Sequence, residues 1–300
     1  MTPQTSDSPA GTPAIGNSRQ ETAYGFRPAL ALYGLALRQH QHGKRWMIMA
    51  LLLILPAIIA CLSRMTGFAI PPRSLEFNLV FMFIPQGLLP LLALVYASGI
   101  LQDEQEEQTI TYILMRPIPR GIVYLSRLAA AVTAALGLAV FSVVLTYVAI
   151  FAGTGVHGVI GRCFDACAVH GLAVVTYCCL FGLMGLLTRR VLIVGITYIA
   201  LVEGLLANIP FTLRMITVIY YARLITYRIM SFSVNTGYRV HDLAAETWQL
   251  NTLNDPKLKL EPSSWLCLTI LLSAAAVFSA GAAFICMQQE FYVKTPEKTA

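Results

Sequence analysis

The sequence predicts an all-α integral membrane protein with six transmembrane helices, and three observations lead to this prediction. Apolar residue types make up 57% of the 300 residues, whereas charged types make up only 12%. Soluble domains contain roughly 25% charged residues, so the composition is that of a membrane protein. The mean hydropathy is +0.67. Finally, charged and proline-containing stretches divide the apolar part into runs of about the length that crosses a bilayer.

The charge balance does not point to nucleic acid, although the chain is basic. There are 21 Lys and Arg residues against 15 Asp and Glu, a formal net charge of +6. The basic residues are scattered among the ends of the apolar runs instead of forming one patch. This distribution is typical of topology signals in membrane proteins, and we expect no nucleic-acid partner.

The N-terminal part divides into a tail and a helix. Residues 1–26 are rich in Pro, Ser, Thr and Gly, a composition that predicts a disordered tail because it cannot bury enough apolar surface. Over 27–45, Leu30, Tyr33 and Leu37 recur at helical spacing and basic residues follow them. This pattern predicts an N-terminal amphipathic interfacial helix. It would begin a six-span transmembrane domain over 27–290, followed by a cytoplasmic C-terminal tail over 291–300.

The apolar runs and the charges between them predict both the spans and their orientation. Arg189 and Arg190 stand in a three-residue turn between two spans, which marks that turn as cytoplasmic. With six spans, both termini then lie on the cytoplasmic side. The predicted spans cover residues 47–62, 79–101, a part of 121–152, 166–187, 191–209 and 265–287.

Residues 210–264 form the longest connection, and they begin with an apolar piece over 211–232. This piece contains Arg214, Arg223 and Arg228. As a further span it would place Arg223 near the middle of the membrane, at a cost of roughly 2.5–3.5 kcal/mol. We therefore expect an outer helical excursion before the last span, made of one or two interfacial or re-entrant helices.

The connection between the second and third spans has the most unusual composition in the chain. Four acids precede Thr109, a plausible helix N-cap, and acids suit the positive end of a helix dipole. Ile110, Ile113 and Leu114 fall on one helical face, and Pro117 ends the helix after about two turns. So short a helix is marginal in water, and we expect its apolar face to dock on a partner. The alternative is an ordinary solvated loop.

The order of acids, Thr109, an apolar pair and the run from Arg116 to Arg120 resembles the loop after the second span in permeases of type-2 exporters with an ATP-binding cassette. In that family the loop implies a coupling helix that seats in a cleft of a separate cytoplasmic ABC ATPase subunit. Two residues depart from the pattern, since Gln108 replaces a usual Gly and Arg127 replaces a usual Lys. The candidate coupling residues are Asp103, Glu104, Glu106, Glu107, Thr109, Ile113, Leu114, Pro117, Pro119 and Arg120.

The resemblance also implies partners, a mechanism and a location. Two permease subunits, as a homodimer or a heterodimer, would pair with two ATPase copies in the lipid of a bacterial inner (plasma) membrane. The chain itself would be no enzyme and need no cofactor, and ATP energy would enter through the loop. The sequence leaves two alternatives open, a secondary transporter driven by an ion gradient and a membrane subunit that anchors another complex without transport.

One carboxyl lies deep within an apolar run. Glu203 is expensive there unless it is protonated or paired, so it is a candidate functional residue, or a structural carboxyl bonded to a neighbouring helix. In the secondary-transporter alternative it would carry the proton. In the structural alternative we expect glutamine to be tolerated at 203 and alanine to be harmful. The stretch 203–214 also resembles the end of the fifth span in the same permeases.

Other chemistry finds little support in the sequence. The chain has no G-x-x-x-x-G-K-[ST], H-E-x-x-H or G-x-S-x-G motif, so neither an internal ATPase of that type nor zinc or serine hydrolysis is predicted. We expect no metal site. Of seven cysteines, only Cys163 and Cys167 stand near the end of a span, where a disulfide or two free thiols are both compatible with the spacing.

Overall fold

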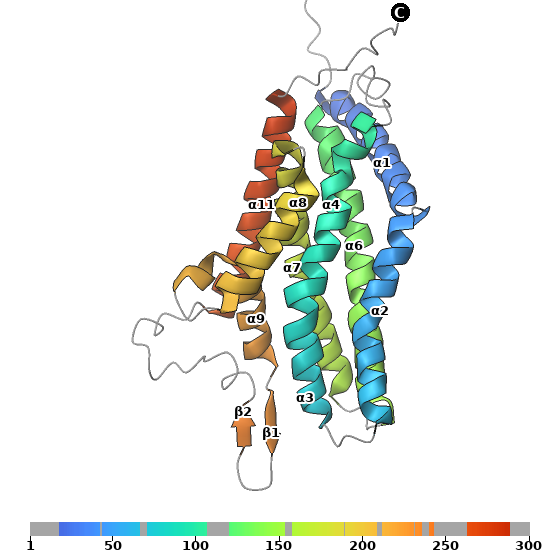
Figure 1. Cartoon of the computed structure of the whole chain (residues 1–300). Helices are drawn as coiled ribbons and strands as arrows, with labels where there is room; N and C mark the ends of the chain where they lie inside the picture. The colour runs from blue at the N-terminus through green and yellow to red at the C-terminus, as the bar shows by residue number, and fades with distance from the viewer. Residues whose placement is uncertain are drawn as a thin grey trace, which may run out of the picture.

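The computed structural model describes residues 18–42, 44–66, 71–106, 120–153, 158–188, 190–208, 212–230, 232–235, 240–242 and 263–288. These residues form a bundle of long helices with one short two-stranded sheet (Figure 1). The predicted helical membrane fold is confirmed. Within the described ranges five helices are long and apolar enough to cross a membrane, so the predicted number of six is not confirmed. They are Arg45–Met65, Pro72–Ile100, Gly121–Phe151, Val159–Leu187 and Ser264–Gln288.

The first helix long and apolar enough to cross a membrane, α2 (Lys44–Met65), extends beyond the predicted span 47–62 at both ends. Its 22 residues correspond to about 33 Å, enough for a hydrocarbon core of ~30 Å. Near its end Arg64 donates to the carbonyl oxygens of Ala149 (3.4 Å) and Ile150 (2.7 Å). These carbonyls belong to the last turn of α6 (Arg120–Phe151), where a cation complements the helix dipole.

The second long helix begins earlier than the sequence predicted. Residues 64–78 were expected to be loop, but α3 (Pro72–Glu76) continues into η1 (Phe77–Leu88) and α4 (Leu89–Glu106). Pro72 opens α3, a position where its missing N–H costs nothing. η1 is wound as a π-helix and contains Pro85. Such wide turns are rare and often lie at functional sites.

The fifth predicted span, 191–209, is broken. α8 (Val191–Tyr198) and the π-wound η2 (Ile199–Leu205) make a helix of about 22 Å, too short to cross the hydrocarbon core. The short turns η3 (Leu206–Asn208) and η4 (Thr212–Ile216) follow, and then α9 (Val218–Ile229), about 18 Å long. Figure 1 shows α9 continuing along the bundle beyond α8.

α9 is the helical excursion that the sequence predicted before the last span, and it lies within the bundle instead of on its surface. It packs against α7 (Val159–Leu187), η1 and α11 (Ser264–Gln288). Most of its residues are buried, including Arg223 with 1% exposure. Two short strands, β1 (Ser233–Asn235) and β2 (Val240–Asp242), follow it as an antiparallel pair.

The N-terminal helix α1 (Ser18–His42) starts within the segment predicted to be a disordered tail. It lies beside α6, where the Tyr33 hydroxyl lies 3.2 Å from Oγ1 of Thr133. Farther along, the His40 ring lies 5.4 Å from the Tyr96 ring of α4. Figure 1 shows α1 following the side of the bundle and leading into α2. The helix is therefore attached to α6 and α4 through specific side chains.

α7 is the central helix of the bundle, with α4, α6, α9 and α11 packed around it. We call the end where α4 stops and α6 begins the loop end. The opposite end, where α6 stops and α7 begins, lies toward β1 and β2 and is called the hairpin end (Figure 1). The largest fully buried apolar side chains include Leu53, Phe81, Ile84, Leu89, Leu92, Tyr124, Tyr177 and Phe181.

Candidate functional site

Most of the predicted coupling residues fall outside the described residues, and the backbone of the others belongs to the ends of α4 and α6 at the loop end. The backbone of α4 stays helical through Asp103, Glu104 and Glu106, and Arg120 is the first residue of α6. The structure therefore describes the two helices that carry the loop. Glu107, Thr109, Ile113, Leu114, Pro117 and Pro119 lie outside the described residues.

The base of this loop is held by a buried arginine. Arg127, two turns into α6 and 7% exposed, donates from Nη1 to the carbonyl oxygen of Ile100 in α4 at 3.1 Å. A charged donor makes a hydrogen bond worth more than a neutral one, about 1.5–3 kcal/mol. The two helices that carry the loop are thus joined directly below it.

Glycines let the neighbouring helices approach this base closely. A Cβ atom on Gly185 of α7 would lie 3.3 Å from the carbonyl oxygen of Ser98 in α4. A Cβ on Gly182 would lie 2.7 Å from the Tyr124 hydroxyl of α6. On α8, a Cβ at Gly195 would lie 2.2 Å from Leu94 of α4. Small residues allow such close helix packing in membranes, so α4 is in intimate contact with α7 and α8.

Glu203 is fully buried on η2. Its Oε1 accepts from the Tyr198 hydroxyl at 3.1 Å and from the N–H of Val218 at 3.2 Å. Its Oε2 accepts from the N–H of Ile219, also at 3.2 Å. Val218 and Ile219 are the first residues of α9, whose N–H groups have no partner inside the helix. Glu203 therefore caps α9 across the break in the fifth segment.

A second polar contact holds α9 from the side. Arg223 donates from Nη2 to Oε1 of Gln86 in η1 at 2.8 Å. Burial of a charge is costly unless hydrogen bonds compensate it, and this bond offsets part of the penalty that the sequence had indicated. Gln86 and Glu203 both come from π-wound segments. The sequence singled out Glu203 and Arg223 separately. In the fold, Arg223 is part of α9 and Glu203 binds the start of the same helix.

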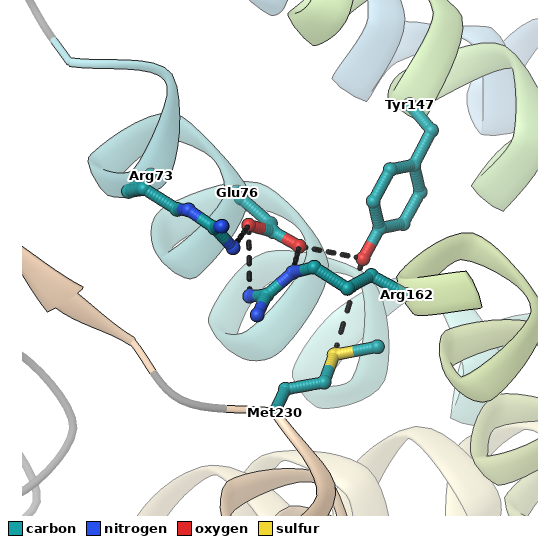
Figure 2. Close-up of polar contacts among 5 residues, drawn as sticks. All are labelled: Arg73, Glu76, Tyr147, Arg162 and Met230. Atoms are coloured by element: carbon teal, nitrogen blue, oxygen red, sulfur yellow. Dashed lines mark hydrogen bonds and ion pairs between the residues drawn. The ribbon is translucent and has the colours of Figure 1, made fainter. Parts of the chain in front are cut away.

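At the hairpin end, a second buried carboxylate collects donors from three helices (Figure 2). Glu76 of α3 is fully buried. Arg162 of α7 binds it with Nε at 2.8 Å from Oε1 and Nη2 at 2.9 Å from Oε2. The Tyr147 hydroxyl of α6 donates to Oε1 at 2.8 Å, and Nη1 of Arg73 lies 3.4 Å from Oε2. Two-point binding of a carboxylate by arginine is among the stronger polar interactions in proteins.

Aromatic and sulfur contacts connect this Glu76 cluster to the chain after α9. The Arg162 guanidinium lies 5.4 Å from the ring centre of Phe232, and Sδ of Met230 lies 3.9 Å from the Tyr147 hydroxyl. Phe232 in turn packs on Phe77 and Phe81, with ring centres 5.6 and 5.1 Å apart. α9 is therefore fixed at both ends, by Glu203 at its start and by the Glu76 cluster after its end.

Sequence reasoning missed the Glu76 cluster. Glu76 belongs to the stretch expected to be an outer loop, and its main partner is 86 residues away. The only signal was an acid at the edge of one apolar run and an arginine at the edge of another. Cys163 and Cys167, on the neighbouring turns of α7, are both free thiols. Within the described ranges, no three His, Cys, Asp or Glu side chains are grouped to bind a metal.

These features define a multi-pass membrane protein: long apolar helices, a charged loop on a tightly packed base, and a broken helix held by buried polar contacts. Residues 41–205 match the family described as ABC-2 family transporter protein, which is more than half of the 300-residue chain. The chain therefore belongs to the ABC-2 transporter family, as the resemblance indicated, and it has the role of an ABC permease in membrane transport. No curated protein matches it.

Proposed function

We propose that this chain is the membrane subunit of an exporter in which a separate cytoplasmic ABC ATPase drives transport through the loop between α4 and α6. The ABC-2 family in general implies a partner ABC ATPase. The observation that carries the proposal is the base of the loop, where Arg127 joins α6 to the carbonyl of Ile100 in α4. A force on the loop then acts on α4 and α6 together, because the two helices are joined at its base.

From this base the movement has a direct route through the bundle. α4 contacts α7 at Gly185 and α8 at Gly195, where an added Cβ would lie 3.3 Å from the Ser98 carbonyl oxygen and 2.2 Å from the Leu94 side chain. α8 leads into η2, whose Glu203 holds the start of α9. Packed interiors transmit displacement because they are dense and incompressible. We infer that displacement of α4 shifts the half-helix α9, which opens and closes the path for the substrate.

The proposal includes the assembly and its location. Two copies of this chain, or this chain and a related subunit, would pair with two ATPase copies in a bacterial inner membrane. Both termini and the loop would be cytoplasmic, as Arg189 and Arg190 indicate through their position in a short turn. The hairpin end would then face the outside.

The apolar face of the loop is the most direct test of the partner. Ile113→Asp together with Leu114→Asp is expected to abolish co-purification with the cognate ATPase while the permease still inserts. Burial of each side chain is worth roughly 1.5–3 kcal/mol, so losing both weakens binding by about a hundredfold or more. Ile113→Leu with Leu114→Ile keeps the apolar face and serves as one control.

A second control separates charge from apolar burial. Gln105→Asp with Gln108→Asp adds the same two charges to polar positions of the same loop, and it should leave binding much closer to the wild type. If the double Asp variant at 113 and 114 still binds the ATPase and stimulates its turnover normally, the coupling role of this loop is wrong.

The orientation is tested by single cysteines in a background without native cysteines. At Gln105, Arg189 and Thr295, a membrane-impermeant thiol reagent added to intact cells is expected to give no labelling. At Asn254 it is expected to label, because that position lies in the long connection proposed to be outside. Permeabilised cells provide the control for reactivity. Labelling at Arg189 in intact cells would reverse the orientation and remove the loop from the ATPase side.

A further inference from the structure

A groove runs between α6 and α7 at the hairpin end, and it is separate from the loop between α4 and α6 and from the Glu203 site. Its volume is about 880 Å³. Val140, Val144 and Val148 line it from α6, and Ile160, Phe164 and Cys167 line it from α7. Side chains at its rims are strongly exposed: Val148 is 61% exposed, Ile160 70% and Phe164 73%. The buried ring of Tyr147 forms part of the floor.

The lining offers a ligand hydrocarbon contact and little else. Apart from two thiols and one tyrosine, the side chains are aliphatic or aromatic. The tyrosine hydroxyl is already engaged, because it donates to Glu76. A polar ligand would therefore lose its hydrogen bonds with water and gain none from the walls, which is unfavourable. An apolar ligand suits the groove.

The length and position of the groove point to a particular apolar ligand. Along α6 it runs from Val140 to Phe151, about 16 Å. One leaflet contributes half of a ~30 Å hydrocarbon core, about 15 Å. The groove lies in the part of α6 farther from Arg127, the last charged residue of this helix. At the hairpin end, Arg64 sits on the carbonyls of Ala149 and Ile150, which places the polar boundary of the membrane there.

The groove has room for an extended hydrocarbon chain along this length, with about 880 Å³ over about 16 Å. A helix of a second subunit is the competing occupant, and cross-linking between two chains through Cys163 separates the two.

We propose that this groove is a binding site for an acyl chain of a bilayer lipid, which lies parallel to α6 and α7 with its headgroup at the hairpin end. The chain would cover the floor formed by Tyr147, whose hydroxyl belongs to the Glu76 cluster. A bound lipid would thereby keep water away from that cluster. The site is independent of the ATPase and of the transported substrate.

The test uses the full chain reconstituted in lipid nanodiscs that contain a phospholipid with a photoreactive diazirine on its acyl chain. After irradiation, cross-links identified by peptide mass spectrometry are expected to concentrate in residues 140–168. The expected excess over the exposed face of α11, around Val277 and Phe284, is about tenfold, equivalent to about 1.4 kcal/mol. Equal labelling of both regions would show ordinary contact with bulk lipid and overturn the proposal.

Variants provide a second readout that does not depend on cross-linking. Val144→Phe with Cys167→Phe fills the groove, and native mass spectrometry after mild detergent extraction should show loss of the lipid retained by the wild type. Val277→Phe adds a ring to an exposed apolar position outside the groove, 67% exposed, and should retain the lipid. Equal retention in the filled variant would contradict the site. So would disulfide or bismaleimide cross-linking of two chains through Cys163, because it would place a second subunit there.

Discussion

Glu76→Ala is expected to destabilise the folded bundle by about 3–5 kcal/mol, the usual cost of removing one partner of a buried ion pair. The carboxylate is fully buried and binds Arg162 at 2.8 and 2.9 Å. Its removal takes away both oxygens that bind Arg162 and the acceptor of the Tyr147 hydroxyl. Thermal unfolding in detergent, followed by the loss of monodisperse protein in size-exclusion chromatography, measures the effect.

A neighbouring arginine provides the matched control. Arg73 contacts the same carboxylate at 3.4 Å, but its side chain is 44% exposed. Exposed ion pairs are worth about 0–1 kcal/mol, so Arg73→Gln should change the unfolding temperature little. The double variant Glu76→Gln with Arg162→Met should recover part of the stability lost in Glu76→Ala, because it removes both charges together. Equal losses for Arg73→Gln and Glu76→Ala would show that burial does not set the strength of this cluster.

Glu203→Ala is expected to cost about 1–3 kcal/mol for each buried N–H left without an acceptor, and to release the start of α9. Glu203→Gln should have an intermediate effect, a different prediction from the sequence-based one that glutamine is tolerated. Both carboxylate oxygens accept backbone N–H groups, from Val218 and from Ile219. An amide has one accepting oxygen, so in either orientation one N–H faces the NH₂ group. Unfolding measurements and proteolysis of the 209–217 segment report the effect.

Tyr198→Phe is the control for this site, because it removes one hydroxyl donor and leaves both N–H contacts of Glu203 in place. It should be milder than either change at Glu203. The secondary-transporter alternative makes a different prediction, since glutamine would then stop transport as completely as alanine, at normal stability. Transport that follows the proton gradient and is lost in a stable Glu203→Gln variant would contradict both the structural role of Glu203 and the ATP-driven mechanism.

The places where the sequence was informative share a physical property. The helices α2, α6, α7 and α11 were predicted from local hydropathy, because a long apolar run in a membrane satisfies its own backbone hydrogen bonds only as a helix. The family followed from a local motif between the second and third helices. The loop residues Ile113 and Leu114 remain predictions, since they lie outside the described residues.

The ends of the helices depended on residues that contact other segments of the chain. The start of the second long helix at Pro72, six residues before the predicted loop ended, is stabilised by contacts of Glu76 with Tyr147 and Arg162. The sequence alone does not show these partners, so it predicts that Glu76 is part of a water-exposed loop. A buried carboxylate becomes acceptable only when its donors arrive from elsewhere in the fold.

By itself, the sequence determined that this protein is a helical membrane protein of the ABC-2 type with a charged loop between its second and third long helices. These properties follow from hydropathy, length and local motifs. Only the tertiary structure decided that the fifth segment is broken and that α9 lies inside the bundle. Hydropathy disfavoured a buried Arg223, but Gln86, 137 residues away, and the Glu203 cap on α9 offset that cost. The cost of burying a polar group depends on its partners, and partners distant in the chain are brought together only by the fold.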